Sequence, residues 1–259
     1  MSSGSGTEAR YDGIAAFYAS AVGDVVEEPA GRALIEVLGE LVGEVRGRRV
    51  LDLACGHGRM SRVLARLGTE VVGADVSSAL LARGRAEEAE EPLGVRYVEV
   101  DAASEGALAG ERFEVVTCHF GLSDIDDLEG VLGTVGRVLE PGGVFAFSIL
   151  HPCFPGWGED APSAWRPGGG YYREGWWLAE NPGFRGQVGS NFRMLSTYLN
   201  ALVRHGLAIE RVAEPDPGAE WAARMPGADA VPVYLVVGCR RASESAGASE
   251  GAGGEDGAG

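Results

Sequence analysis

Three aspartates each follow an apolar run that predicts a β-strand. Asp52 lies in LDLACGHGR, Asp75 in VVGADVSS and Asp101 in YVEVDAAS. In an open parallel sheet the carboxyl ends of the strands meet at one edge, and ligands bind there. A carboxylate at Asp52, beside the glycine pair Gly56 and Gly58, would repel a pyrophosphate but suits a cationic amine. Asp75 is placed to accept hydrogen bonds from ribose hydroxyls, and Asp101 from an exocyclic amine such as that of adenine. The pattern predicts a ligand with an amine, a ribose and an adenine but no phosphate.

Residues that can handle a proton follow the fourth and fifth predicted strands. His119 and Asp124 lie in CHFGLSDID, and His151 lies in SILHPCF. A histidine titrates near neutrality and can act as a general base, whereas a carboxylate can orient an N–H or O–H donor. The same histidines could equally be structural hydrogen-bonding residues. We therefore treat His119, Asp124 and His151 as candidate catalytic residues with this alternative open.

An aromatic-rich interval, residues 151–190, follows the fifth predicted strand. It holds four of the five tryptophans and is rich in glycine. We expect it to form a lid and a substrate wall over the carboxyl edge of the sheet, because long loops in compact domains are usually functional. The alternative is that these aromatic side chains only pack a surface insertion. Together with flanking residues, the candidates for substrate binding are Tyr18, Trp165, Tyr172, Trp176, Trp177 and Arg193.

The elements that must position these residues alternate between helical and strand patterns. Apolar runs without alternation, separated by amphipathic segments, predict an α/β fold in which helices cover both faces of a mostly parallel sheet. A final pair of strands joined by a loop predicts an antiparallel strand at the sheet edge. The predicted strands are 49–53, 70–74, 95–100, 113–119, 144–150, 207–214 and 231–239; the predicted helices are 13–21, 31–45, 60–67, 77–90, 126–139 and 192–205.

Composition excludes several classes of protein. The 259 residues contain 22 basic and 38 acidic side chains, a net charge of −16, and every basic residue is an arginine. Without lysine there is neither a Schiff-base lysine nor a phosphate-binding Walker lysine. The acidic balance makes nucleic acid and anionic membranes poor partners. Four scattered cysteines show no metal-ligand spacing, so we expect no metal and a reducing, cytoplasmic location.

Both ends of the chain are low in complexity. We expect residues 1–10 and 241–259 to be disordered tails around one domain, 11–240, in which 151–190 is the lid insertion. No stretch is apolar enough to cross a membrane.

Four segments resemble the successive motifs of class I S-adenosylmethionine-dependent methyltransferases: VLDLACGHGRM, VGADVSSAL, the VDA at residues 100–102 and LEPGGVFAF. S-adenosylmethionine has the amine, ribose and adenine that the three aspartates predict. The family's glycine loop begins D/E-x-G, where this chain has Ala54. The resemblance implies a Rossmann-like sheet of seven mostly parallel strands. It also implies a cofactor site formed by Tyr11, Asp52, Ala54, Gly56, Gly58, Asp75, Val76, Asp101, Ala102 and Cys118.

The resemblance implies methyl transfer to a small acceptor. The aromatic interval favours an aromatic natural product such as an indole or phenol, methylated at N, O or C, with S-adenosyl-L-homocysteine as the second product. The alternatives are a ubiquinone- or menaquinone-type ring C-methyltransferase, a nicotinamide-dependent oxidoreductase and a non-catalytic module that only binds the cofactor. The carboxylate at Asp52 argues against a nicotinamide dinucleotide. We expect a monomer or a homodimer.

Overall fold

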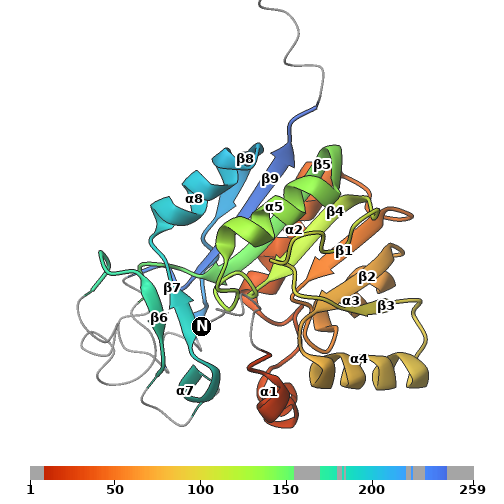
Figure 1. Ribbon diagram of the computed structural model, residues 1–259, viewed down its shortest axis with the longest axis horizontal. Coiled ribbons are helices and arrows are strands. Elements are labelled where there is room, and N and C mark those ends of the chain that lie inside the picture. The colour runs from red at the N-terminus through yellow and green to blue at the C-terminus, as the bar shows by residue number, and fades with distance from the viewer. Residues whose placement is uncertain are drawn as a thin grey trace, which may run out of the picture.

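The computed structural model describes residues 9–154, 170–179, 183, 185–219, 223 and 231–243. Its main sheet has seven strands in the order β3-β2-β1-β4-β5-β9-β8 (Figure 1). These strands are β1 (Arg49–Leu53), β2 (Glu70–Asp75), β3 (Arg96–Glu99), β4 (Phe113–His119), β5 (Leu139–Leu150), β8 (Leu207–Ala213) and β9 (Tyr234–Arg241). Strand β9 is antiparallel to both of its neighbours, β5 and β8, and the other pairings are parallel. The predicted α/β fold with one antiparallel strand at the carboxyl-terminal end is confirmed.

Two hydrophobic cores lie on the two faces of this sheet. One is formed with α5 (Leu128–Val138) and α8 (Leu195–Arg204), and the other with α2 (Pro29–Val42), α3 (Arg59–Arg66) and α4 (Ser78–Glu90). The central strands are buried on both faces, which explains why their sequences are continuously apolar rather than alternating. Figure 1 shows α5 and α8 together in front of the sheet, with α2 behind it. The predicted helices on both faces are confirmed.

Local signals set several of the element boundaries. The Ser77 side chain accepts a hydrogen bond from the backbone N–H of Leu80 and caps α4, so that helix begins at Ser78. Asp127 caps α5 in the same way, so that helix begins at Leu128 and not at Asp126. Helix α2 ends at Val42 because Gly43 adopts a positive φ of 72°.

The segment Glu140-Pro-Gly-Gly143 separates the predicted helix 126–139 from the predicted strand 144–150. It lies within β5 as an irregularity, because the pairing of β5 with β4 shifts between Phe113 and Val115. The predicted helix 192–205 is also shorter in the structure. Residues up to Phe192 belong to a strand, and α8 begins at Leu195.

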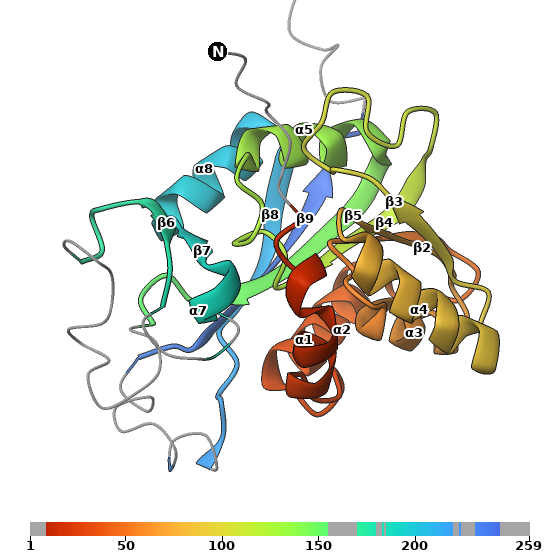
Figure 2. The same cartoon turned by 60° about the horizontal axis from the view of Figure 1, so that its bottom comes forward.

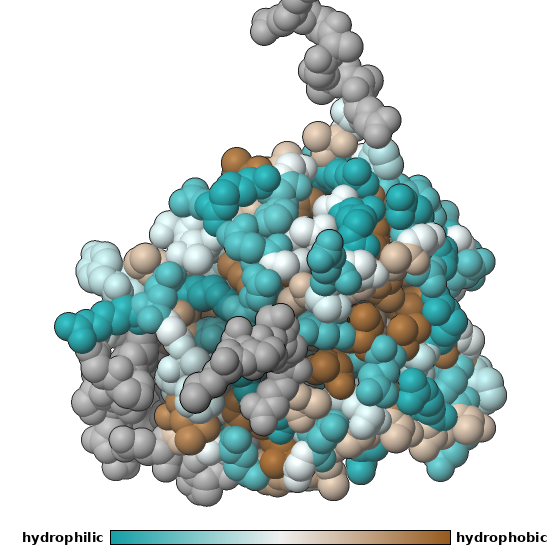
Figure 3. All heavy atoms as spheres, viewed as in Figure 1, coloured by the Kyte–Doolittle hydropathy of each residue, from teal (hydrophilic) through white to brown (hydrophobic). Residues whose placement is uncertain are grey.

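Five short elements lie beyond the main sheet. The segment η1 (Asp12–Ile14) leads into α1 (Ala15–Ala21), while β6 (Gly175–Trp177) and β7 (Ser190–Phe192) form a second sheet around α7 (Arg185–Val188). Helices α1 and α7 both lie at the end of the main sheet where β5 finishes (Figure 2). The sequence did not predict β6, β7 or α7. On the face shown in Figure 3, hydrophilic residues predominate and hydrophobic ones form separate groups.

The predicted tail boundaries change at both ends. Arg10 forms an ion pair with Asp126, and Arg241 is the last residue of β9, so both belong to the folded part. The remaining predicted tail residues, 1–8 and 244–259, lie outside the described residues, as does the stretch 155–169 of the predicted lid. Within the described parts of the chain, no helix is long and apolar enough to span a membrane.

Candidate functional site

A cavity of about 880 Å³ opens at the carboxyl ends of β1, β2 and β4. This is the edge where the strand order reverses between β1 and β4, the usual ligand position in open α/β sheets. Ten of the residues proposed from the sequence line it: Tyr11, Tyr18, Ala54, Gly56, Asp75, Val76, Asp101, Ala102, His119 and Asp124. The sequence therefore located the cavity, although not every residue proposed for it.

Asp75 joins the loop after β1 to the start of α4. One carboxylate oxygen accepts a hydrogen bond from the backbone N–H of Gly56 at 2.8 Å, and the other accepts one from the backbone N–H of Ser77 at 2.8 Å. Burial raises the pKa of Asp75, and these backbone hydrogen bonds oppose the rise. A carboxylate offers about four lone-pair sites, so two bound N–H groups leave capacity for a ligand's hydroxyl groups.

The loop before α3 has unusual backbone conformations at two positions that line the cavity. Ala54 and Gly56 have φ angles of 52° and 58°, both in the left-handed region. Glycine adopts this region at little cost, but Ala54 adopts it with steric strain. Both residues line the cavity, so the strained turn holds the backbone against the ligand space.

Asp52 does not lie in the cavity, which corrects its predicted contact with a ligand amine. Its side chain is buried and accepts hydrogen bonds from Ser61 Oγ at 2.6 Å and Thr117 Oγ1 at 2.9 Å. Burial raises the pKa of Asp52 to about 6, while the two hydroxyl donors oppose the rise. Asp52 thus fastens β1 to α3 and β4 beneath the loop.

Two further residues proposed as cofactor contacts lie outside the cavity. Gly58 has a φ of 93°, and a Cβ atom there would lie 2.0 Å from Tyr97 Oη, so the glycine is needed for packing of the loop on β3. Cys118 is fully buried between β4 and its neighbours, and burial raises the pKa of its thiol. Both residues pack beneath the loop and the strands that carry the lining residues, and neither lines the cavity.

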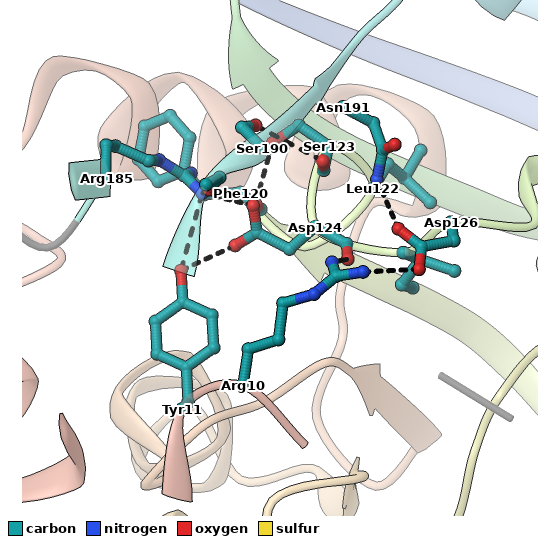
Figure 4. Close-up of polar contacts among 12 residues, drawn as sticks. Arg10, Tyr11, Phe120, Leu122, Ser123, Asp124, Asp126, Arg185, Ser190 and Asn191 are labelled. Atoms are coloured by element: carbon teal, nitrogen blue, oxygen red, sulfur yellow. Dashed lines mark hydrogen bonds and ion pairs between the residues drawn. The ribbon is translucent and has the colours of Figure 1, made fainter. Parts of the chain in front are cut away.

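A polar network joins three segments above the cavity (Figure 4). The Tyr11 hydroxyl donates to the Asp124 carboxylate at 2.7 Å, and the Arg185 guanidinium forms an ion pair with the same carboxylate. Arg185 also donates to Tyr11 Oη at 3.4 Å and to the backbone oxygen of Gly189 at 3.0 Å. Burial and the Asp124 charge raise the pKa of Tyr11. We name this set, Tyr11, Asp124 and Arg185, the bridge.

A second contact group lies beside the bridge. The Asp126 carboxylate accepts hydrogen bonds from Arg10 at 2.5 Å and from the Asn191 side chain at 2.8 Å. Figure 4 shows these residues next to the bridge. Two sets of polar contacts, the bridge and the Asp126 group, thus connect the N-terminal segment, the β4–α5 loop and the α7–β7 segment. Sequence reasoning missed Arg185 and Arg10; the one available signal was that Arg185 lies inside the predicted lid.

His119 is part of another series of polar contacts at the cavity. Its Nδ1 lies 2.7 Å from Ser148 Oγ and its Nε2 lies 3.2 Å from Glu28 Oε2. The other Glu28 oxygen accepts a hydrogen bond from Arg59 at 2.7 Å. Glu28 and Arg59 both line the cavity; sequence reasoning assigned a role to neither, although Arg59 ends the motif LDLACGHGR.

Apolar side chains surround this corner. The ring centroids of Phe120 and His119 are 4.4 Å apart, and those of Phe120 and Tyr234 are 6.0 Å apart. Leu150 and Pro29 also line the cavity. Among the described residues, the aromatic surface of this corner thus comes from Phe120, which follows β4, and Tyr234, the first residue of β9.

His151 and Arg193 do not line the cavity, which corrects both predictions. His151 is buried; its Nδ1 accepts a hydrogen bond from the backbone N–H of Cys153, and its Nε2 lies 3.1 Å from Glu214. The Arg193 guanidinium is buried and donates to three backbone carbonyl oxygens, of Leu122, Ile125 and Asp126, at 2.7 to 2.9 Å. Both side chains hold loops in place.

The described aromatic residues of the predicted lid also lie away from the cavity lining. Tyr172 is 86% exposed and Trp176 is 51% exposed, and neither they nor Trp177 line it. Trp176 instead covers Gly189, where a Cβ atom would lie 2.5 Å from its ring, and it stacks with the Arg10 guanidinium. Their predicted contact with a substrate is therefore corrected, whereas Trp165 lies outside the described residues.

Metal ligands do not gather anywhere in the described segments: no group of three or more His, Cys, Asp or Glu side chains there could hold an ion. The cysteines are likewise separate and free.

Comparison with known proteins gives consistent matches. A family model described as a methyltransferase domain matches residues 51–147. The ubiquinone biosynthesis O-methyltransferase of Alkalilimnicola ehrlichii is 32% identical over 117 residues, which are 45% of this chain and 47% of that protein. The chain thus spans about half the length of the curated relatives it matches.

Solved structures match over more of the chain. An S-adenosylmethionine-dependent methyltransferase from Mesorhizobium loti is 32% identical, with a TM-score of 0.66, over 84% of this chain and 100% of that one. The 1,6-didemethyltoxoflavin-N1-methyltransferase of Burkholderia thailandensis, crystallised with 1,6-didemethyltoxoflavin and S-adenosylhomocysteine, has a TM-score of 0.60 at 18% identity, over 90% of this chain and 87% of that one. At that identity the likeness concerns the fold alone.

Proposed function

The chain belongs to the family of S-adenosylmethionine-dependent methyltransferases, and from that premise we propose that it methylates a small aromatic acceptor at O, N or C. The observation that carries the proposal is the division of the cavity. Asp75 and Asp101 lie at the ends of β2 and β3, on one side of β1 in the strand order. On the other side of β1, Phe120 follows β4, Tyr234 begins β9, and His119 at the end of β4 contacts Glu28. One cavity thus offers a polar side for the cofactor and an aromatic side for an acceptor.

The residues of the polar side fit the family's cofactor. Asp75 retains hydrogen-bonding capacity for the two ribose hydroxyls. Asp101 and Ala102 line the same cavity, which supports their proposed contact with the adenine amine. The backbone at Ala54 and Gly56 faces the same space. When bound, S-adenosylmethionine supplies the electrophilic methyl group, and the protein aligns the acceptor with it.

The bridge is proposed to exclude water from the reacting groups. Tyr11 and Tyr18 contact each other edge to face, with ring centroids 4.9 Å apart, and both line the cavity. Arg185 and Asp124 connect them to the segment before β7. The aromatic faces and the acids also favour a positively charged ligand centre over an anionic one.

An aromatic hydroxyl is the favoured acceptor group among the possibilities. The curated relatives that match the chain are named ubiquinone biosynthesis O-methyltransferases, and phenols were among the acceptors that the sequence favoured. This supports O-methylation over the alternative of ring C-methylation. The natural-product class of the acceptor is part of the same proposal.

Calorimetric titration tests the proposal in two steps. We expect S-adenosylmethionine and S-adenosylhomocysteine to bind and NAD(H) not to bind. Radiolabelled methyl transfer to a panel of phenols and indoles should then yield at least one methylated product. Binding of NAD(H) alone would favour an oxidoreductase, whereas cofactor binding without turnover on any acceptor would identify a non-catalytic binding module.

A further inference from the structure

We infer that Glu28, acting at the aromatic corner of the cavity, receives the hydrogen-bond donor of the acceptor, and that the acceptor is a neutral aromatic molecule with an O–H or N–H group. This rests on the proposed function and specifies the acceptor side of the same cavity. His119, the candidate base from the sequence, is then a positioning residue that acts through Glu28.

The position of Glu28 in the chain directs its carboxylate into the cavity. Glu28 precedes Pro29, the first residue of α2, and its side chain does not cap that helix. The carboxylate instead lies between Arg59 and His119 at the cavity, and the Glu28 side chain is 27% exposed. An ionised carboxylate with two partners still has lone pairs for a third donor.

His119 has no ring nitrogen left for a substrate. Burial lowers the pKa of His119, and the Glu28 carboxylate only partly opposes this, so the ring is neutral at pH 7. A neutral ring carries one proton, and an ionised Glu28 can only accept, so that proton lies on Nε2. Nδ1 then accepts from Ser148 Oγ at 2.7 Å. Both ring nitrogens are engaged. Of the residues Ser148, His119 and Glu28, we therefore infer that Glu28 accepts the hydrogen bond from the acceptor molecule.

Glu28 is ionised in this environment. Burial opposes its ionisation, but hydrogen bonds from His119 and Arg59 outweigh burial and lower the pKa of Glu28. Hydrogen bonds to a charged acceptor are about twice as strong as neutral ones. A donor on the acceptor molecule would therefore be held strongly and in a fixed direction.

The surroundings of Glu28 fit a flat molecule. Phe120 and Tyr234 form an aromatic wall, with Leu150 and Pro29 beside it. Burial and the Glu28 charge raise the pKa of Tyr234. An aromatic ring stacked on this wall would present a substituent to Glu28.

The charges of the cavity disfavour an anionic acceptor. Each arginine among its described lining residues is paired with a carboxylate: Arg10 with Asp126, Arg59 with Glu28 and Arg185 with Asp124. Further acids, including Asp24 and Glu27, line the same cavity. A phosphate or carboxylate on the acceptor would be repelled by these acids, and each arginine of the described lining already pairs with a carboxylate of the protein.

Three naphthalene probes test the inference by calorimetry on the full chain saturated with S-adenosylhomocysteine. The first is 2-naphthol, the second is 2-methoxynaphthalene, which lacks the donor, and the third is the anionic 2-naphthoate. We expect 2-naphthol to bind about tenfold or more tightly than either of the others. Equal binding of the naphthol and the ether, tighter binding of the naphthoate, or no binding of any probe at millimolar concentration would each overturn the inference.

Variants then assign the preference to Glu28. The naphthol-to-ether ratio should fall to about one in Glu28→Met and be partly retained in Glu28→Gln, whose side-chain oxygen still accepts, while the neighbouring control Glu27→Gln keeps it. Loss of the ratio in His119→Asn with retention in Glu28→Met would make His119 the contact residue and overturn the inference. Should Glu28→Met not fold, the wild-type ratios and Glu28→Gln decide. Failure of the protein to bind S-adenosylhomocysteine is a separate result, which would refute the proposed function itself.

Discussion

At the scale of single residues, Asp75 has a structural and a proposed ligand role in one side chain. Asp75→Ala should weaken binding of S-adenosylhomocysteine by about 3–6 kcal/mol, because two charge-assisted hydrogen bonds of about 1.5–3 kcal/mol each are lost. The variant should also unfold more easily, since the backbone N–H groups of Gly56 and Ser77 lose their acceptor. Titration calorimetry of Asp75→Ala beside the cavity-lining control Asp24→Ala measures the difference. An unchanged dissociation constant in Asp75→Ala would remove the residue from the proposed ribose site.

Asp52 should make the stability of the protein depend on pH, because burial raises its pKa to about 6. Its unfolded value is near 3.9. The folded protein therefore binds more protons than the unfolded chain between about pH 4 and 6, and the stability gained from protonated Asp52 is lost as the pH rises through 6. From pH 4 to pH 7 the wild type should therefore lose stability that Asp52→Asn keeps. The unfolding free energy of the variant minus that of wild type should rise by about 2–3 kcal/mol over this range. Urea titrations at several pH values test this, and a constant difference would show that burial does not raise this pKa.

At the scale of elements, the bridge ties α1 and α7 to the β4–α5 loop. The Arg185 and Asp124 side chains are only 14% and 22% exposed, so removing one partner leaves a largely buried charge. Arg185→Met should destabilise the fold by about 3–5 kcal/mol, and the double variant with Asp124→Leu should recover part of the loss. The exposed pair Arg204 and Glu129 is a matched control, where Arg204→Met should cost less than about 1 kcal/mol. Additive losses in the double variant would show that the two charges do not depend on each other.

The second element-scale prediction compares two aromatic residues. Trp176 lies on β6, outside the cavity lining, whereas Phe120 follows β4 and lines it. Trp176→Ala should leave binding of 2-naphthol within about threefold of wild type, while Phe120→Ala should weaken it about tenfold, the ~1.4 kcal/mol expected of an aromatic contact. Calorimetry with bound S-adenosylhomocysteine measures both. The opposite order would restore the tryptophan-rich interval as the acceptor wall.

At the scale of the whole molecule, the net charge of −16 governs the class of partner. Nucleic acid binding needs arginines that are available to phosphates, and many arginines of the described chain are paired with acids. We expect no retention of DNA or RNA in a gel-shift assay at physiological salt. A salt-sensitive complex at sub-micromolar protein would contradict this and would indicate a polynucleotide acceptor.

The sequence by itself determined the sheet, the position of the cavity and much of its polar side. Parallel strands bring their carboxyl ends to one edge, so Asp75 and Asp101 were located from strand patterns alone, and the resemblance added Ala102. The sequence did not determine which way the Asp52 side chain points, because the apolar run around it lacks the alternation that distinguishes the two faces of a strand.

The acceptor side depended on the tertiary structure. Glu28 and His119 are 91 residues apart, and Asp124 and Arg185 are 61 apart, so no local pattern relates them. Their pairing follows from the packing of α2 against the sheet and of α7 near α1 over its edge. Burial then selected the partners, because a charge removed from water is stable only beside an opposite charge or a hydrogen bond. Folding thereby decided which carboxylate lies beside His119 and Arg59 at the cavity and which arginine pairs with Asp124.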